Sequence, residues 1–184
     1  MSAVRKRGMA FVDLDYVLSG FRELRGELAR IDFGLLMLNL SPGYVELIRT
    51  YYYTARPEPD EEPKAYEQWR KHVKAIQQTQ NAKVRLGHLV GEGSKKRQKG
   101  VDVYLALEMY RLARDDAYDV AILVSGDGDF VELVEQVQNT GRRVLVRYFE
   151  RHCSEHLKRA GDYREALDEL ATDERVVSAC APAP

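Results

Sequence analysis

Short apolar runs bounded by glycine, proline or acidic residues divide the chain into strand-sized pieces. Val120–Val124 is apolar throughout, which is typical of a strand buried on both faces. Tyr44–Tyr53 is rich in β-branched and aromatic residues and is bounded by turn residues, so it predicts a strand as well. The predicted strands are Gly8–Asp13, Tyr44–Tyr53, Val84–Val90, Val120–Val124 and Val144–Tyr148.

Between these runs, apolar residues recur with the spacing of one helical face. Val101, Leu105 and Met109 are an example. Helices are predicted over Phe21–Ile31, Lys64–Asn81, Val101–Ala113, Phe130–Asn139, Ser154–Ala160 and Tyr163–Leu170. Leu35–Leu40 is apolar and fits either a helix or a strand.

Strands that alternate with helices predict right-handed crossovers and a mainly parallel sheet. The expected fold class is α/β, a three-layer α/β/α sandwich around a central sheet. We expect one domain over residues 1–172 and a flexible tail over residues 173–184, because the last residues show no element pattern.

Composition is that of an ordinary globular chain. Of the 184 residues 45% are hydrophobic and 31% charged, and the net charge of -1 excludes a globally basic nucleic-acid binder but allows local patches. Cys153 and Cys180 are too few for a disulfide framework, which favours a reducing compartment. No apolar stretch approaches the roughly 20 residues of a membrane span. We therefore expect a cytoplasmic protein without a membrane segment.

Acidic residues follow two of the predicted strands. Asp13 and Asp15 come after the first strand, and Asp127 and Asp129 come after the fourth. In parallel α/β sheets, ligands bind outside the carboxyl ends of the strands. Bare carboxylates repel one another there, and a divalent cation that prefers oxygen ligands, such as Mg²⁺ or Mn²⁺, removes that cost.

These aspartates also fit simpler roles. Aspartate is a favoured N-cap, and a helix is predicted from Phe130. For an isolated Asp-Gly-Asp turn that interpretation is the better one, but the buried strand before it and the second acidic strand end favour a metal site. Asp102 is similarly either a first-turn acid that the helix dipole tolerates or a side chain held near the other acids.

The densest basic run comprises Lys95, Lys96, Arg97 and Lys99. It lies in a glycine-flanked loop directly before Asp102. Charge runs are usually solvated loops. Because this one adjoins an acidic motif, we favour contacts with nucleic-acid phosphates.

Two motifs occur together in the second half of the chain. They are Lys99-Gly-Val-Asp-Val103 and Ser125-Gly-Asp-Gly-Asp-Phe130. The pair resembles the signature of NYN domains, in the LabA-like branch of the PIN-like nucleases. The similarity extends from Lys99 to Phe149 in nearly every segment, whereas residues 21–83 match only in the order of elements.

The resemblance implies a PIN-like, Rossmann-like fold and hydrolysis of RNA, preferably single-stranded. Carried over position by position, the catalytic and metal-binding acids are Asp13, Asp102, Asp127 and Asp129. They would position one or two Mg²⁺ or Mn²⁺ ions against the scissile phosphate. Ser125 would contact RNA beside them, together with the basic run. Self-association is left open.

The first strand end departs from the family pattern. NYN domains usually have Asp-Gly-x-Asn there, and this chain has Asp13-Leu14-Asp15-Tyr16. Asp15 is either a substitute ligand or a surface charge, and Tyr16 replaces the usual amide. The alternative function is therefore an RNA- or protein-binding PIN-like module with weakened or lost catalysis.

Three other features receive simpler interpretations. His152 and His156 have the helical spacing of a metal pair but lack an evident third ligand. The tyrosines of Tyr51–Tyr53 are more typical of packing than of base stacking. Glu108 is interpreted as a supporting or surface residue, because its offset takes it off the face of Asp102.

Overall fold

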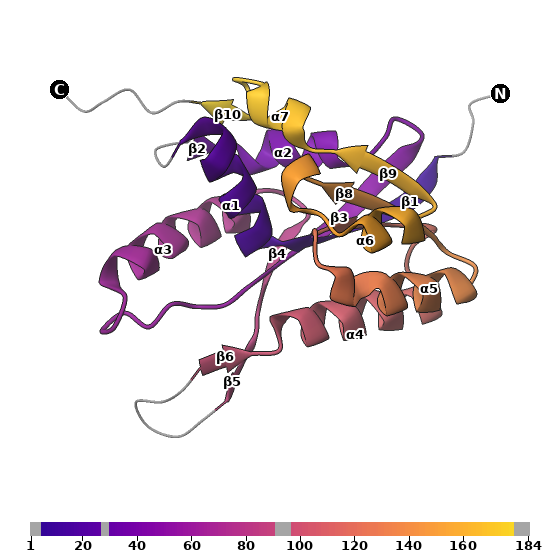
Figure 1. The fold of residues 1–184 in the computed structure, drawn as a ribbon, viewed down its shortest axis with the longest axis horizontal. Helices are drawn as coiled ribbons and strands as arrows, with labels where there is room; N and C mark the ends of the chain where they lie inside the picture. Colours follow the sequence, from indigo (N-terminus) through magenta and orange to yellow (C-terminus); the bar gives the residue numbers. More distant parts are fainter. Residues whose placement is uncertain (1–4, 27–29, 91–96, 179–184) are drawn as a thin grey trace.

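The computed structural model describes residues 5–26, 30–90 and 97–178, with the backbone alone for 88–90, 97–99 and 178. In this part of the chain a six-stranded sheet forms the centre (Figure 1). Two short antiparallel pairs stand apart from it: β2 (Arg30–Ile31) with β10 (Val177–Ser178), and β5 (His88–Val90) with β6 (Arg97–Lys99).

All neighbours in the central sheet run parallel. The order is β4 (Ala82–Leu86), β3 (Val45–Thr54), β1 (Lys6–Asp13), β7 (Val120–Val124), β8 (Arg143–Tyr148) and β9 (Tyr163–Ala166). Because β1 lies between β3 and β7, the strand that carries Asp13 is central, and its carboxyl end shares an edge with theirs.

Helices cover both faces of the sheet. One face packs against α1 (Leu14–Arg25), α2 (Phe33–Leu40), α3 (Pro63–Gln78) and α7 (Asp168–Thr172). The other packs against α4 (Val101–Arg114), α5 (Val131–Asn139) and α6 (Glu155–Ala160). The short 3₁₀ helices η2 (Gly128–Phe130) and η3 (Glu150–His152) follow β7 and β8. The three-layer α/β/α prediction is therefore confirmed.

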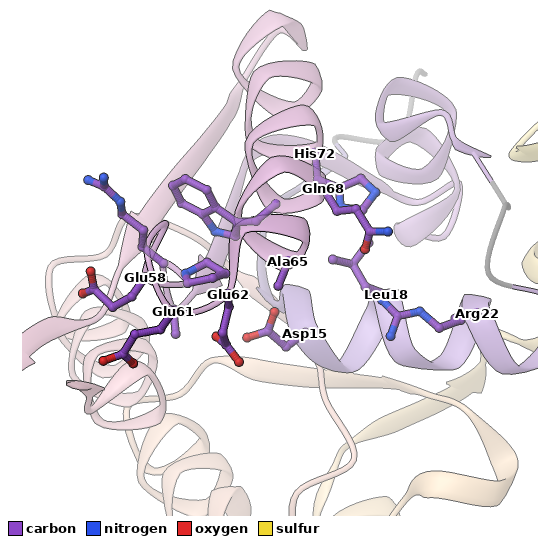
Figure 2. Close-up of a pocket in the computed structure, with 13 residues that line it drawn as sticks. Asp15, Leu18, Arg22, Glu58, Glu61, Glu62, Ala65, Gln68 and His72 are labelled. Carbon is purple, nitrogen blue, oxygen red and sulfur yellow. The ribbon is translucent and has the colours of Figure 1, made fainter. Parts of the chain in front are cut away.

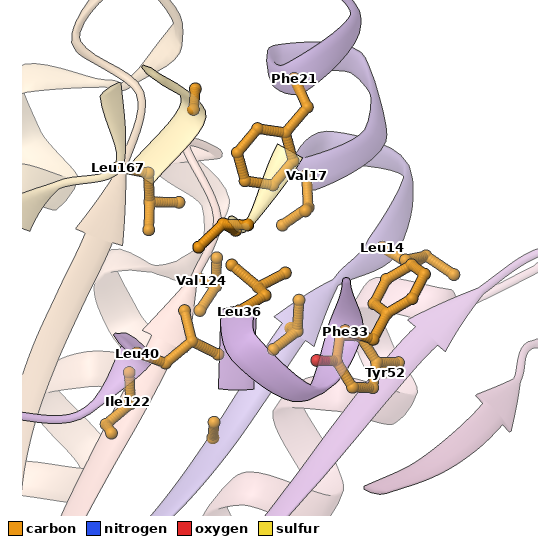
Figure 3. Close-up of a cluster of buried hydrophobic side chains, with 14 of the residues drawn as sticks. Leu14, Val17, Phe21, Phe33, Leu36, Leu40, Tyr52, Ile122, Val124 and Leu167 are labelled. Atoms are coloured by element: carbon orange, nitrogen blue, oxygen red, sulfur yellow. The ribbon is translucent and has the colours of Figure 1, made fainter. Parts of the chain in front are cut away.

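Successive side chains of a strand point to opposite faces of the sheet, so alternate residues belong to two different cores. In β1, Ala10 and Val12 join the cluster beneath α1 and α2, whereas Met9 and Phe11 join the cluster beneath α4 and α5. Figure 3 shows the first cluster, with Ile122 of β7 facing the helices that cover it. Both faces of the central strands are buried, which explains why their sequences are apolar without alternation.

Several predicted boundaries differ from the structure. The predicted helix Tyr163–Leu170 is wrong, because Tyr163–Ala166 pairs with β8 as an edge strand. The predicted strand Val84–Val90 is divided: β4 ends at Leu86, and residues 88–90 pair with β6 in a separate hairpin. The first helix begins at Leu14 because the Asp13 carboxylate accepts the Tyr16 N–H and caps it.

The C-terminal segment belongs to the core for longer than predicted. Val176 and Val177 are buried, and β10 pairs with β2. The predicted boundary at residue 172 therefore falls too early, and residues 179–184 of the predicted tail lie outside the described residues. None of the described helices is long and apolar enough to cross a membrane.

One glycine shows how tightly α1 packs on the sheet. A Cβ at Gly20 would lie 2.1 Å from Cε2 of Phe149, and the Phe149 ring is itself buried against Phe21 at a centroid distance of 5.4 Å. The ring therefore occupies the space that a side chain at position 20 would need.

Gly20→Ala should destabilise the protein, although alanine normally stabilises a helix interior by about 1 kcal/mol over glycine. Displacing the Phe149 ring should cost about 1–3 kcal/mol net. Urea unfolding checks this, with Ser19→Ala, at the exposed neighbouring helical position, as the control that should be neutral or stabilising. A Gly20→Ala protein as stable as wild type would contradict the packing argument.

Candidate active site

The register of the sheet places the carboxyl ends of β1 and β7, which carry the acidic residues, at the same end of the sheet. Val12 of β1 pairs with Val124 of β7, so Asp13 leaves the sheet beside the turn that carries Asp127 and Asp129. Asp102 comes to the same place from the first turn of α4, which Gly100 precedes with a left-handed φ of 82°.

The pKa values show that these carboxylates act on one another. Burial raises the pKa of Asp13 to about 6, and the charges of Asp15 and Asp102 add to the rise. Partial burial also raises the pKa of Asp102, with further contributions from Asp127 and Asp129. Asp102 thus lies within electrostatic reach of Asp13 and also of Asp127 and Asp129. We call Asp13, Asp102, Asp127 and Asp129 the acidic edge, and their joint role as a site stays a prediction.

Two of these aspartates also cap the helices that follow them. Asp13 Oδ1 accepts the Tyr16 N–H at 3.1 Å, and Asp127 Oδ1 accepts the Asp129 N–H at 2.9 Å. The capping role considered for Asp127 is therefore real. It does not compete with a metal role, because a carboxylate has about four lone-pair positions for acceptance.

Asp15 lies between the acidic edge and a neighbouring pocket. Its Oδ1 accepts the Thr54 hydroxyl at 3.3 Å, and it lines the pocket between α1 and α3. The side chain keeps contact with solvent, but the concave surroundings remove part of its water and raise its pKa, with a smaller contribution from Asp102. The Thr54 hydroxyl therefore orients an exposed carboxylate, and the choice between a substitute ligand and a surface charge stays a prediction.

Tyr16 has a structural role. Its hydroxyl accepts the Phe149 N–H at 2.7 Å, and its ring packs on the Phe149 ring at 5.5 Å. Burial raises the Tyr16 pKa, so the hydroxyl stays neutral. The side chain ties α1 to the residue that follows β8, so its hydroxyl is engaged there.

The turn after β7 is built by close contacts. Ser125 is fully buried and its hydroxyl accepts the Asp127 N–H at 3.2 Å, so it shapes the turn and has no surface for the RNA contact predicted for it. A Cβ at Gly126 would lie 1.8 Å from the His152 carbonyl oxygen. Gly126 is needed for this close approach and not for a left-handed conformation, which the described backbone does not have there.

Glu108 has a role that sequence reasoning underestimated. It is 5% exposed, accepts the Tyr53 hydroxyl at 2.8 Å and forms a bidentate pair with Arg85, whose Nη2 lies 2.9 Å from Oε1. These contacts tie α4, which carries Asp102, to β3 and β4. No local pattern marks this network, since its members are far apart along the chain.

The predicted RNA-binding run is described only in part, and the two histidines discounted above as a metal pair lie on different elements. Lys95 and Lys96 lie outside the described residues, and Arg97 and Lys99 are described only by their backbone pairing in β6. His152 lies in η3 against the Glu23 carboxylate, while His156 is in α6, so the two histidines do not share a helix.

No group of three or more His, Cys, Asp or Glu side chains in the described residues is arranged to hold a metal ion. The acidic edge therefore supplies carboxylates of suitable chemistry without a closed ligand cage. In open parallel α/β sheets, ligands bind outside the carboxyl ends of the strands, which is where these aspartates lie.

Comparison with known proteins identifies the family. The family model of the NYN domain matches residues 7–168, so the chain belongs to the NYN domain family, which is part of the PIN-like nuclease superfamily. An uncharacterized protein of Sinorhizobium fredii, y4oD, is 40% identical over 70 residues, which are 38% of this chain and 31% of that protein. The match thus spans about a third of that relative's length.

A solved structure supports the fold. The crystal structure of VPA0982, a protein of unknown function from Vibrio parahaemolyticus, superposes with a TM-score of 0.68 and 22% sequence identity. The match covers 96% of this chain and 99% of that one. At this identity the likeness concerns the fold alone.

The raised Asp13 pKa predicts how stability depends on pH. Ionised Asp13 is disfavoured in the folded state, so its contribution falls as pH rises from the ordinary value of 3.8 to about 6. In chelator, the free energy of unfolding of Asp13→Asn should exceed that of wild type by about 3 kcal/mol near pH 7.5 and by less than half of that near pH 4.5, because asparagine keeps the N-cap without the charge.

Urea unfolding at the two pH values measures this difference. Asp119→Asn is the control of opposite sign, since hydrogen bonds from Arg7 lower the Asp119 pKa. It should be less stable than wild type at the higher pH. An Asp13→Asn variant no more stable than wild type there would refute the burial argument.

Proposed function

We propose that the protein is a metal-dependent ribonuclease that hydrolyses phosphodiester bonds of single-stranded RNA at the acidic edge. The observation that carries the proposal is the position of Asp13 at the carboxyl end of β1, where burial, with the charges of Asp15 and Asp102, raises its pKa to about 6. A carboxylate that is partly buried beside other acids is costly for folding, which is typical of a site that binds a cation.

Asp13, Asp102, Asp127 and Asp129 would hold Mg²⁺ or Mn²⁺, for which carboxylate oxygens are suitable ligands. When bound, such a cation lowers the pKa of a coordinated water and offsets negative charge on the phosphate. Mg²⁺ usually keeps several waters and takes only one or two carboxylates together with substrate phosphate. An open set of acids is compatible with that mode of binding.

The residues around the acids have supporting roles in this proposal. Asp13 and Asp127 are oriented by the N–H groups that they cap, and the Glu108 network holds α4 and with it Asp102. Lys95, Lys96, Arg97 and Lys99 would neutralise RNA phosphates, which the acids alone repel.

A second candidate is an RNA-binding module with weakened or lost catalysis. The observation in its favour is Tyr16, whose hydroxyl is engaged by the Phe149 N–H where NYN domains usually have an asparagine. This candidate predicts RNA binding without turnover, so a cleavage assay separates the two.

Cleavage of a fluorescently labelled single-stranded RNA should require Mg²⁺ or Mn²⁺ and stop with chelator. Asp102→Asn and Asp127→Asn should each reduce the rate by about 100-fold or more, because each removes a ligand charge and keeps the shape of the side chain. Circular dichroism should show that both variants remain folded.

Asp115→Asn is the matched control, an exposed aspartate at the other end of α4. It should cleave at the wild-type rate. Full activity of the Asp127→Asn variant would overturn the assignment of the site, and metal-dependent RNA binding without any cleavage by wild type would establish the second candidate.

Replacing Lys95, Lys96 and Arg97 together by alanine should weaken binding to all RNA sequences alike. The slope of log affinity against log salt should flatten by about 0.7 for each RNA phosphate that the variant no longer neutralises. Lys6→Ala with Arg143→Ala is the control, since these residues begin β1 and β8 at the opposite edge of the sheet. An unchanged slope in the triple variant would show that the basic run is only a solvated loop.

A further inference from the structure

A pocket of about 570 Å³ lies between α1 and α3, within the usual size range of small-molecule sites. Figure 2 shows how it is built: Asp15 and Arg22 come from α1, Glu58 and Glu62 from the loop before α3, and Gln68 from α3. We call it the α1–α3 pocket. It belongs to none of the roles assigned so far.

The α1–α3 pocket adjoins the acidic edge. Asp15, which lines it, is two residues from Asp13, and its carboxylate is held by the Thr54 hydroxyl at the end of β3. A ligand in the pocket would therefore lie beside the acidic edge.

The pocket has an aromatic wall. Trp69 lines it, and the Trp69 ring stacks on Tyr66 with a centroid distance of 5.8 Å and an interplanar angle of 26°. Arg56 in turn lies 5.3 Å from the centroid of the Tyr66 ring. Trp69 is thus fixed in a stack, and it offers the pocket an aromatic surface of the kind on which nucleobases pack.

The polar groups of the pocket combine both signs of charge. Asp15, Glu58, Glu61 and Glu62 supply carboxylates, and Arg22 and Arg56 supply guanidinium groups. The excess of acids disfavours a phosphate as the ligand. It favours a neutral ring with N–H donors for the carboxylates and acceptors for an arginine.

Guanine meets these requirements better than uracil. Its N1–H and N2–H₂ groups form a donor pair that one carboxylate can accept, and its O6 and N7 atoms form an acceptor pair that arginine recognises. Uracil offers a single N–H donor between two carbonyl acceptors, so a carboxylate that accepts this N–H also faces a carbonyl oxygen.

We propose that the α1–α3 pocket binds a nucleobase of the RNA strand next to the phosphate at the acidic edge, with a preference for guanine over uracil. This proposal rests on the proposed ribonuclease function, since it names the part of the same substrate that the neighbouring pocket takes. In this proposal, base preference is determined by the loop before α3 and by the face of α3 that lines the pocket.

Trp69 is the single tryptophan of the chain, so its fluorescence reports on the pocket. The full-length protein in chelator is titrated with GMP, AMP, CMP and UMP, with free tryptophan as the correction for light absorption and ribose 5-phosphate as the phosphate control. GMP should change the fluorescence saturably with an affinity about tenfold above that of UMP, and ribose 5-phosphate should have no effect.

A charge variant tests the recognition. Glu58→Gln, Glu61→Gln and Glu62→Gln together should weaken GMP binding by about tenfold. Glu62 is at the N-cap position of α3 but makes no side-chain cap bond, so its change removes none. Glu46→Gln, Glu132→Gln and Glu135→Gln together are the matched control with the same charge change on exposed residues elsewhere, and GMP affinity should not change.

The outcomes separate this proposal from the ribonuclease function. Absence of a saturable response, equal affinity for GMP and UMP, a response to ribose 5-phosphate, or unchanged GMP affinity in the pocket variant would each overturn the base pocket, even if the protein cleaves RNA. A selective GMP response in a protein that cleaves no RNA would instead support the pocket and refute the ribonuclease function.

Discussion

The parallel pairing of β1 with β3 on one side and β7 on the other is the constraint on which the rest of the molecule depends. Residue by residue it sets Asp13 opposite Tyr53 and one position beyond the pair formed by Val12 and Val124. Both faces of β1 and β7 are buried, each in a different core. A slip of one residue in their pairing would therefore turn every side chain of the slipped strand from its own core towards the other one. The register that the core requires is therefore also the register that gathers the acids.

Ionised Asp13 and Asp102, whose pKa values are raised by burial and by neighbouring acids, oppose folding, so their positions must be enforced by neighbours. Asp13 and Asp127 are oriented by the helix N–H groups that they cap. Around them, Glu108 joins α4 to β3 and β4, Tyr16 joins α1 to the end of β8, and Gly126 allows the turn to reach the His152 carbonyl. These supports do not touch a substrate, but each fixes one of the elements from which a carboxylate projects.

The central strands and the acidic positions could be predicted because their signals are local. Val120–Val124 is continuously apolar and is followed at once by its aspartates. The edge strand β9 could not, because its residues are mostly exposed and only pairing with β8 makes Tyr163–Ala166 extended. The Glu108 network and the α1–α3 pocket were not predictable either. Both form from segments that are distant in sequence, and no periodicity links Arg22 to Gln68.

In the proposed function, the recognition of an RNA strand would be divided by charge. The acidic edge repels phosphates until cations neutralise it, so attraction of the backbone must come from elsewhere. The basic run beside the start of α4 is the proposed source, whereas the α1–α3 pocket is net acidic and suits a base. Asp15 adjoins the pocket and the edge at once, and its anchoring by Thr54 fixes the distance between them. A base held there would position its phosphate without any attraction from the acids, which accounts for placing a neutral-ligand pocket next to a negatively charged site.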